Sequence, residues 1–385
     1  MSGSMKEQVA IVGMGCTKFG EHFTKSWSDL AVDAAFEACA DAGVELKDVE
    51  AAWLGSYRPW IAGERNTGSP LSEALGFLGK PVTLISNICA TGIDTLRNAC
   101  LAVSSGMYDV VLAIGVEKMR DAGSRSLMLA NRSDGHPLIA KGRTAPSFFA
   151  CCAHRYFHTY GIGREVLAKV AMKNHHNGTL SPKAYMQREI TIEDALKSPW
   201  VAEPLTVLDS TASCDGAAAA IVTRADLARN FRADFINVKG IGFAVGTERN
   251  IFDPDFTFLD FKVTQTAARM AYEQAGIKDP RREIDIAECH DCFTITELIT
   301  YEDMGFCKKG EGGKWIEEGH PTLNGTKPCN PSGGLKAKGH PIGATGVAQI
   351  CELWWHLRGE AEERQVKDAQ IGCTHNLGGL GTVVL

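Results

Sequence analysis

The sequence predicts an α/β protein built from two doubly wound halves of the same design. Short apolar runs alternate with small-residue or amphipathic stretches of helical length, the pattern of β-α-β units around a sheet covered on both faces. The alanine pattern of residues 34–44 recurs at residues 267–277, at a constant offset of 233. A pattern that recurs in this way predicts two pseudo-equivalent halves packed together.

The first half is expected to contain five strands, at residues 9–15, 51–56, 81–87, 108–117 and 217–223. A helix is expected over residues 28–43, with Ser28 as its cap. Four of its residues have the spacing of a core face: Val32, Ala35, Phe36 and Cys39. A second, small-residue helix starts at Cys89 and ends near Met107.

The second half repeats this order. Strands are expected at residues 235–246, 284–289, 369–374 and 381–385, with helices at 262–276 and after His340. Between the apolar strand 108–117 and the strand 217–223, Arg, Lys, His, Gly and Pro become frequent. We therefore predict an N-terminal half of residues 1–117 and 209–232, an inserted loop domain of residues 118–208, and a C-terminal half of residues 233–385.

Composition excludes several classes of protein. Of the 385 residues, 44% are hydrophobic and 22% charged, as in an ordinary globular protein. A formal net charge of −6 argues against a nucleic-acid binder, and no apolar run predicts a membrane span or a signal peptide. Thirteen scattered cysteines indicate free thiols in a reducing compartment, so we expect a cytoplasmic protein. Gly13-Met14-Gly15 lacks the spacing of a dinucleotide-binding loop.

Cys89 is the first candidate for chemistry. An apolar, β-rich run leads to it and a helix follows, so we expect it at a strand-to-helix corner on the first helical turn. The free N–H groups and the positive dipole end of a helix favour a thiolate there. A buried structural cysteine is the alternative from this stretch alone.

A second set of motifs lies in the C-terminal half. His340 stands between glycines before the helix that starts with Gly343-Ala344-Thr345-Gly346, and a histidine on such a loop suits a proton acceptor for a thiol. The glycines indicate a close approach to the main chain. Cys289 and Cys292 have the spacing of half a zinc site, which His340 or Cys373 would complete, but no second closely spaced pair supports it.

Taken together, the motifs resemble the thiolase superfamily, and within it the branch of sterol-carrier-protein-X-type thiolases with bacterial and archaeal acetyl-CoA acetyltransferase-like relatives. The resemblance covers essentially the whole chain. It rests on His-Asp-Cys-Phe at 290–293, Asn-Pro-Ser-Gly-Gly at 330–334, Gly-His-Pro at 339–341 with the glycine-rich helix start, and His-Asn-Leu-Gly-Gly at 375–379. The resemblance implies the thiolase fold, two βαβαβαββ halves with an inserted loop domain.

The resemblance also implies roles for single residues. Cys89 would be the nucleophile, His340 the base that activates it, Cys292 the proton shuttle, and His290 a donor to the thioester oxygen. Many thiolases carry a second cysteine in a C-x-G motif near the C-terminus, and this chain has His375 there. His375 could act as a relay or an oxyanion donor, or be structural. The backbone of Cys89 and of the glycine loop around Gly379 would form an oxyanion site.

The implied activity is thiolytic cleavage of a 3-oxoacyl-CoA, or the reverse Claisen condensation, with coenzyme A as a substrate and no permanently bound cofactor or metal. Basic residues of the inserted lobe are candidates for the CoA phosphates: Lys141, Arg143, Lys173, Lys183 and Arg188. Ser332 and Gly333 are further candidates for substrate binding. Five aromatic residues could line an acyl pocket: Trp53, Tyr57, Trp60, Phe148 and Phe149.

Family resemblance and the long apolar strands favour a homodimer, and relatives of this branch suggest a small OB-fold, zinc-ribbon protein as partner. Two other functions stay open. One is a carbon–carbon lyase that runs a retro-aldol on a CoA thioester, but such relatives lack the nucleophilic cysteine that Cys89 supplies. The other is a catalytically degenerate acyl-CoA-binding subunit of a complex.

Overall fold

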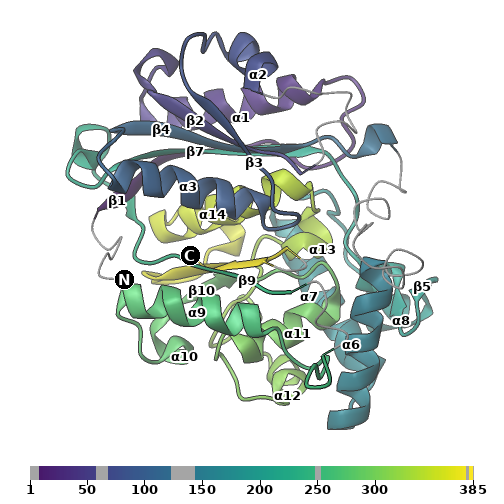
Figure 1. Ribbon diagram of the computed structural model, residues 1–385. Helices are drawn as coiled ribbons and strands as arrows, with labels where there is room; N and C mark the ends of the chain where they lie inside the picture. The colour runs from purple at the N-terminus through teal and green to yellow at the C-terminus, as the bar shows by residue number, and fades with distance from the viewer. Residues whose placement is uncertain (1–7, 58–67, 123–143, 248–252, 379–380, 385) are drawn as a thin grey trace.

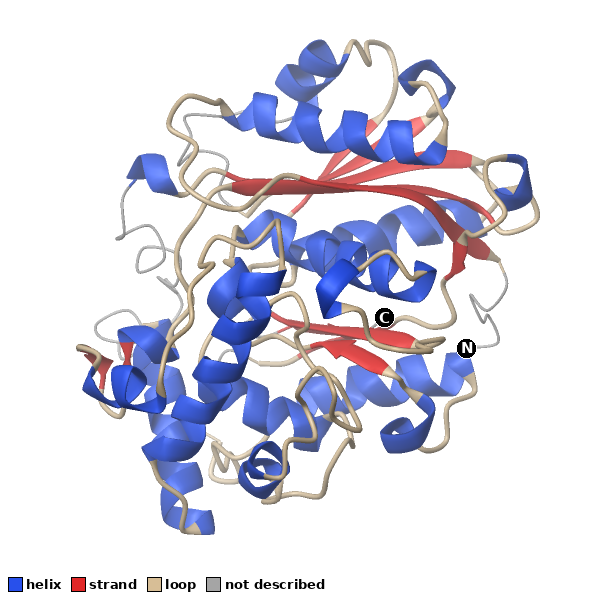
Figure 2. Cartoon of the chain, turned by 180° about the vertical axis from the view of Figure 1, so that it is seen from behind, coloured by secondary structure: helices blue, strands red, loops and turns tan. Residues whose placement is uncertain are grey.

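Two β-sheets and three layers of helices organise the protein (Figure 1). The computed structural model describes residues 8–57, 68–122, 144–247, 253–378 and 381–384. Helices lie outside each sheet and a further layer of helices lies between the sheets, which Figure 2 shows from behind. This arrangement confirms the predicted fold class. Within the described residues no helix combines the length and apolar character needed to cross a bilayer.

The first sheet has six strands in the order β3-β2-β4-β7-β1-β8. Their bounds are β1 Val9–Cys16, β2 Ala51–Gly55, β3 Val82–Ile85, β4 Val110–Glu117, β7 Gly216–Arg224 and β8 Ile236–Asn237. Strand β2 runs parallel to β3 and β4, whereas β7 is antiparallel to both β4 and β1. The central strands β1, β4 and β7 are buried on both faces, as their continuous apolar runs predict.

The second sheet has four strands in the order β10-β11-β12-β9, and it repeats the pairing of the first. Their bounds are β9 Gly242–Val245, β10 Ile286–Glu288, β11 Gly372–Leu377 and β12 Gly381–Val384. The first pair is parallel and the next two pairs are antiparallel, as in the run β2-β4-β7-β1. In the described chain, the position that corresponds to β3 is held by one parallel bridge between Ala287 and Cys329.

The helices form the other layers. In the first half α1 spans Trp27–Ala42, α2 Gly68–Leu75 and α3 Thr91–Ser104; in the second half α9 spans Lys262–Ala275, α10 Pro280–Glu283, α11 Thr294–Asp303, α12 Gly312–Glu317, α13 Gly334–Lys338 and α14 Ile342–Arg358. Helices α3 and α14 make the layer between the sheets (Figure 1). Between β4 and β7 the chain forms α6 Ala145–Tyr160, α7 Arg164–Leu180, α8 Ile192–Lys197, β5 Trp200–Ala202 and β6 Leu205–Thr206. The boundaries of the inserted domain stay a prediction.

Glycines let equivalent helices approach equivalent strands. A Cβ at Gly13 would lie 2.4 Å from the carbonyl oxygen of Ala38, and one at Gly15 would lie 2.2 Å from that of Ala34. In the second half a Cβ at Gly240 would lie 2.3 Å from the carbonyl oxygen of Ala271, and one at Gly242 would lie 1.7 Å from that of Ala267. Ala34 and Ala38 are related to Ala267 and Ala271 by the offset of 233. The Gly-Met-Gly sequence in β1 therefore serves close helix–sheet packing.

Several local predictions were wrong. Helix α1 is capped by Ser26, because Ser26 and Asp29 exchange side-chain to backbone hydrogen bonds in a capping box that Ser28 does not make. Phe36 is 52% exposed, since the buried face of α1 follows its alanines instead. The strand expected at 235–246 is split: β8 joins the first sheet and β9 the second.

Candidate active site

A tight turn at residues 87–90 carries Cys89 and precedes α3. The side chain of Thr91 accepts a hydrogen bond from the backbone of Asn87 at 2.8 Å and donates to the carbonyl of Ile88 at 2.6 Å. Ile88 has a φ of 45°, which is uncommon and strained for a β-branched residue. The prediction that Cys89 lies on the first helical turn was wrong, because the helix starts only at Thr91 and Cys89 lies just before it.

The glycines that follow His340 bring the two halves of the site together. A Cβ at Gly92 would lie 2.7 Å from the backbone nitrogen of Gly346, and a Cβ at Gly346 only 2.2 Å from that of Ile93. The start of α3 and the start of α14 therefore touch backbone to backbone. The glycines of this motif predict that something comes close to the main chain there. In the structure this is the start of α3, from the first half of the chain.

Glu117, at the end of β4, fixes the same contact. Its carboxylate accepts hydrogen bonds from the backbone of Tyr57 and of Gly343, each at 2.9 Å, and from the hydroxyl of Ser56 at 3.2 Å. One buried side chain thus ties the ends of two strands of the first half to the first turn of α14. Sequence reasoning missed Glu117, and the only signal was a charged residue ending an otherwise apolar strand.

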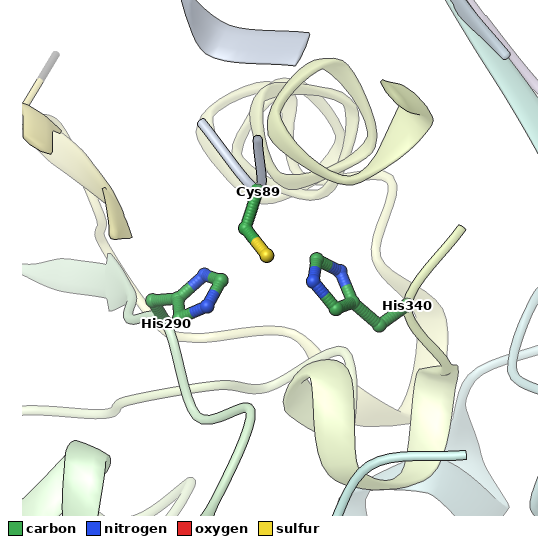
Figure 3. A group of neighbouring side chains, drawn as sticks. All are labelled: Cys89, His290 and His340. Carbon is green, nitrogen blue, oxygen red and sulfur yellow. The ribbon is translucent and has the colours of Figure 1, made fainter. Parts of the chain in front are cut away.

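Cys89, His290 and His340 meet at the junction. The Sγ of Cys89 and one ring nitrogen of each histidine lie within 4.8 Å of one another, and Figure 3 shows the sulfur between the two imidazoles. The two rings stand edge to face, with centroids 5.3 Å apart. Both histidines are buried, and Cys89 is half-buried. The structure thus brings together three of the four residues predicted to be catalytic.

His340 has a defined orientation. Its Nδ1 lies 2.7 Å from the hydroxyl of Thr345, and that hydroxyl donates its own proton to the carbonyl of Pro341 at 3.0 Å. The hydroxyl oxygen must therefore accept from Nδ1–H. This leaves the lone pair on Nε2, which has no hydrogen-bond partner among the described residues. Nε2 is thus free to accept a proton.

The fourth residue, Cys292, follows His290 on a loop that is anchored through Asp291. The carboxylate of Asp291 accepts hydrogen bonds from the backbone of Leu335 at 2.6 Å and of Lys336 at 3.1 Å, at the start of α13. The side chain of Asn174 on α7 donates to it at 2.7 Å. These bonds hold the two neighbours of Asp291 in fixed positions beside Cys89.

Burial keeps the site neutral at rest. It raises the pKa of the Cys89 thiol to about 12, and the nearby Glu117 carboxylate adds to the rise. It lowers the pKa of His340 to about 3. Burial also raises the pKa of Cys292 well above its usual value, and the proximity of Cys89 raises it further. Burial and the Glu117 carboxylate both oppose the thiolate that the sequence predicts for Cys89, so the resting side chain is a thiol.

His375 extends the cluster. It lies on β11, its ring is 6.5 Å from the ring of His290, and its Nε2 is 3.1 Å from the hydroxyl of Thr264. Burial lowers its pKa to about 3. Gly378 packs on the Cys89 turn, since a Cβ there would lie 2.8 Å from the carbonyl oxygen of Asn87. Gly379 lies outside the described residues.

The predicted CoA-binding residues are either outside the described residues, exposed, or paired with a carboxylate. Lys141 and Arg143 lie outside the described residues, and Arg188 is exposed. The prediction was wrong for Lys173, which is buried and donates to Glu297 and to the carbonyl of Cys329, each at 2.7 Å. Lys183 is paired with Glu37 at 2.9 Å.

Ser332 and Gly333 are both buried in contacts within the protein. The hydroxyl of Ser332 donates to Glu288 at 2.8 Å, and Gly333, with a φ of 96°, packs against Gly178 of α7. These contacts account for both residues without a ligand, and their part in substrate binding stays a prediction.

The aromatic candidates do not form one pocket wall. Trp60 is outside the described residues, and Trp53 packs edge to face with Tyr108. Tyr57 packs beside Cys89, together with Met119 and Ile342. Phe148 and Phe149 belong to another group, in which the ring of Phe149 lies 5.0 Å from that of Phe293, the neighbour of Cys292.

The half-zinc alternative finds no support. In the described part of the chain, Cys89, His290 and His340 form the only group of three such ligands with atoms this close. Cys289 and Cys292 therefore do not gather around His340 or Cys373.

The duplicated fold, and a thiol between two imidazoles at the junction of its halves, are the features of an enzyme class that transfers acyl groups through cysteine. Residues 9–226 match the model of the thiolase N-terminal domain, and residues 245–384 match the thiolase C-terminal domain-like model. The chain therefore belongs to the thiolase family. It is an acyltransferase of the thiolase type, as the sequence motifs predict.

Similar proteins support the same branch. An acetyl-CoA acetyltransferase of Methanothermobacter thermautotrophicus is 41% identical over 374 residues, which are 97% of each chain. Sterol carrier protein 2 of Bos taurus is 35% identical over 402 residues, 99% of this chain and 72% of its own. These relatives confirm the predicted sterol-carrier-protein-type branch.

Solved structures share the fold across the whole chain. The Ltp2–ChsH2(DUF35) aldolase superposes with a TM-score of 0.84 at 25% identity, covering 99% of this chain and 98% of its own. Human mitochondrial 3-ketoacyl-CoA thiolase in complex with CoA gives a TM-score of 0.71 over the same shares of the two chains. At 18% identity, the human enzyme is a likeness of fold alone.

Proposed function

We propose that this thiolase cleaves a 3-oxoacyl-CoA with free CoA through an acyl-Cys89 intermediate, or runs the reverse condensation. The observation that carries the proposal is the Sγ of Cys89 within 4.8 Å of ring nitrogens of His290 and His340. The orientation of His340, with Nε2 free of any described partner, supports its part as the base.

Two half-reactions account for the atoms. In the first, the sulfur of Cys89 attacks the 3-keto carbon as its proton moves to Nε2 of His340. The bond between C2 and C3 then breaks, the acyl group stays on sulfur, and the acetyl-CoA enolate takes a proton from Cys292. In the second, the CoA thiol gives its proton to the Cys292 thiolate and its sulfur attacks the acyl-Cys89 thioester. The bond between the acyl carbon and Cys89 breaks, acyl-CoA leaves, and the Cys89 sulfur takes its proton back from His340.

Each carbonyl oxygen that gains charge needs a donor. His290 is the proposed donor to the thioester oxygen of the leaving enolate. For the tetrahedral intermediate on Cys89 we propose the backbone of Cys89 and of the glycine loop, which is supported by the packing of Gly378 on the Cys89 turn. Donors fixed in a buried site stabilise such oxygens more than water does.

Intact-mass measurement tests the intermediate. The protein is incubated with a panel of 3-oxoacyl-CoAs and the mass gain per chain is recorded, with Cys89→Ala as the matched control. We expect one acyl group per chain, localised to Cys89 by peptide mapping. Turnover without any acyl adduct, or an adduct retained in Cys89→Ala, would contradict the mechanism.

The proton shuttle is tested by comparing Cys292→Ser with His375→Asn. If Cys292 is the shuttle, Cys292→Ser slows α-proton exchange of a saturated acyl-CoA in deuterated water by about 10²–10⁴-fold. It still permits acylation of Cys89, while His375→Asn exchanges faster than Cys292→Ser. Normal exchange in Cys292→Ser with slow exchange in His375→Asn would assign the shuttle to His375.

The likeness to an aldolase at 25% identity keeps a retro-aldol lyase as the second candidate. A lyase of this kind makes no acyl-enzyme, so the mass experiment separates the two functions. A degenerate acyl-CoA-binding subunit would give neither acyl adduct nor turnover alone.

We further propose a homodimer and a small partner protein. Among the described residues, strand β3 is one of the two edges of the first sheet, and Leu84 on it and Leu101 on α3 are exposed. An uncovered edge with apolar side chains is suited to pairing with a second copy. The similar aldolase pairs Ltp2 with ChsH2(DUF35), which supports the proposal of a partner protein.

Coenzyme A serves as a substrate in this proposal, and no permanently bound cofactor takes part. We also propose a cytoplasmic location, supported by thirteen cysteines that are all free thiols.

A further inference from the structure

The junction of the two halves also has the donor set of a transition-metal site. One thiol sulfur and two imidazole nitrogens lie within 4.8 Å of one another. Sulfur and imidazole nitrogen are the ligands that Zn²⁺ prefers, and three protein ligands with a fourth, open position are a common zinc arrangement. We propose that Cys89, His290 and His340 bind a Zn²⁺ ion, which competes with the acyl group for Cys89 and so inhibits the enzyme reversibly.

The distances fit with small adjustments. Zinc bonds of about 2.1 Å to nitrogen and 2.3 Å to sulfur, in tetrahedral geometry, separate the ligand atoms by about 3.4–3.6 Å. No two of the three ligand atoms lie more than 4.8 Å apart, so the ligands need to close by little more than about an ångström. Figure 3 shows the sulfur between the two rings, so a position among the three side chains is within reach of all of them.

The donor atoms are available. Nε2 of His340 and both ring nitrogens of His290 have no hydrogen-bond partner among the described residues, although His340 is 1% and His290 0% exposed. Buried polar atoms are normally paired, so these nitrogens are open to a ligand. Nδ1 of His340 is already held by Thr345, as the second nitrogen of a zinc-bound histidine usually is.

Charge and protons also balance. Zinc replaces the thiol proton of Cys89, which leaves the protein as one H⁺ for each ion bound. The zinc–thiolate unit then carries one positive charge, and the buried Glu117 carboxylate is close enough to raise the pKa of Cys89. Water fills the fourth position. Because the ion occupies the sulfur that acylation needs, it acts as an inhibitor of the resting enzyme and not as a resident cofactor.

Equilibrium binding of zinc to the full chain tests the proposal directly. Protein freed of metal with a chelator is titrated with zinc chloride in competition with a chromogenic zinc indicator. We expect one zinc per chain, and at least about 100-fold weaker binding in Cys89→Ser and in His340→Asn. Cys151→Ser is the matched control, because Cys151 is an exposed thiol outside the site and its loss should change nothing.

Cobalt and alkylation give a second readout. Co²⁺ in the same site should show a thiolate-to-metal charge-transfer band that Cys89→Ser lacks, and zinc should protect Cys89 from iodoacetamide. Equal zinc affinity in wild type and Cys89→Ser, or binding lost in Cys151→Ser, would overturn the proposal. Neither measurement needs substrate, so a failure of the proposed thiolase mechanism leaves this test intact. An enzyme that acylates Cys89 but binds no zinc would refute the zinc site alone.

Discussion

Thr345 sets the tautomer of His340, and replacing it should therefore disable the proposed base while leaving the fold in place. Thr345→Val keeps the shape of the side chain but removes the oxygen that accepts Nδ1–H at 2.7 Å. The carbonyl of Pro341 keeps two backbone donors, from Ala344 and Thr345, so it is not left unpaired. The lesion is then confined to the imidazole.

Two effects set its magnitude. An unpaired buried donor costs about 1–3 kcal/mol, and an imidazole that is no longer held can move its proton to Nε2, where it blocks the transfer from Cys89. General-base catalysis contributes about 10²–10⁴-fold, so we expect acylation of Cys89 to slow about 10²-fold in Thr345→Val. Thr345→Ser, which retains the hydroxyl, should recover most of the rate.

The assay is a single-turnover measurement of acyl-Cys89 formation by intact mass, with thermal unfolding as a control for the fold. A valine variant that acylates within about threefold of the wild-type rate would refute the reasoning, because the loss expected of a general base is at least 10²-fold. Equal losses in the serine and valine variants would show that packing, and not the hydroxyl, matters.

Burial lowers the pKa of both His340 and His375 to about 3, so unfolding takes up protons below about pH 6.5. The free energy of unfolding should therefore fall by about 1.4 kcal/mol per pH unit for each histidine as the pH drops. Urea unfolding at pH 7, 6 and 5 should show a shallower pH dependence in His375→Asn than in the wild type, and an unchanged slope would contradict this. Because the pKa of Cys89 is about 12, its alkylation by iodoacetamide should accelerate up to at least pH 10, and a plateau near neutral pH would reveal a resting thiolate. Leu84→Lys on the exposed edge strand should convert the proposed dimer to monomers in light scattering, whereas Phe36→Lys, at an exposed site on the outer helix, should not.

The duplicated architecture could be predicted because local sequence patterns indicate it. Apolar strands and alanine-rich helices recur at a fixed offset, and each pattern needs only its own neighbours to be recognised. The split of the predicted strand 235–246 between two sheets could not be predicted from the sequence, because it depends on which sheet edge lies nearest in the folded chain. The cap of α1 was missed because Ser26 and Ser28 are equivalent until the partner, Asp29, is identified.

The site could be predicted as a set of residues but not as a geometry. Cys89, His290 and His340 were found from motifs, yet the resting charge of Cys89 depends on burial, which no motif states. Lys173 was misassigned for a related reason. A lysine in a polar segment normally faces solvent, and its partner Glu297 is 124 residues further along the chain.

The division of the site between the halves explains why its glycines are where they are. Cys89 comes from the first half, and His340 and His290 come from the second, so the site exists only if α3 and α14 approach along their first turns. Gly92 and Gly346 permit that approach, and side chains there would push the two helices apart. The same contact fixes the distance between thiol and imidazole that proton transfer requires. A duplicated fold thus gains chemistry at the one surface where its copies meet, through residues that differ between the copies.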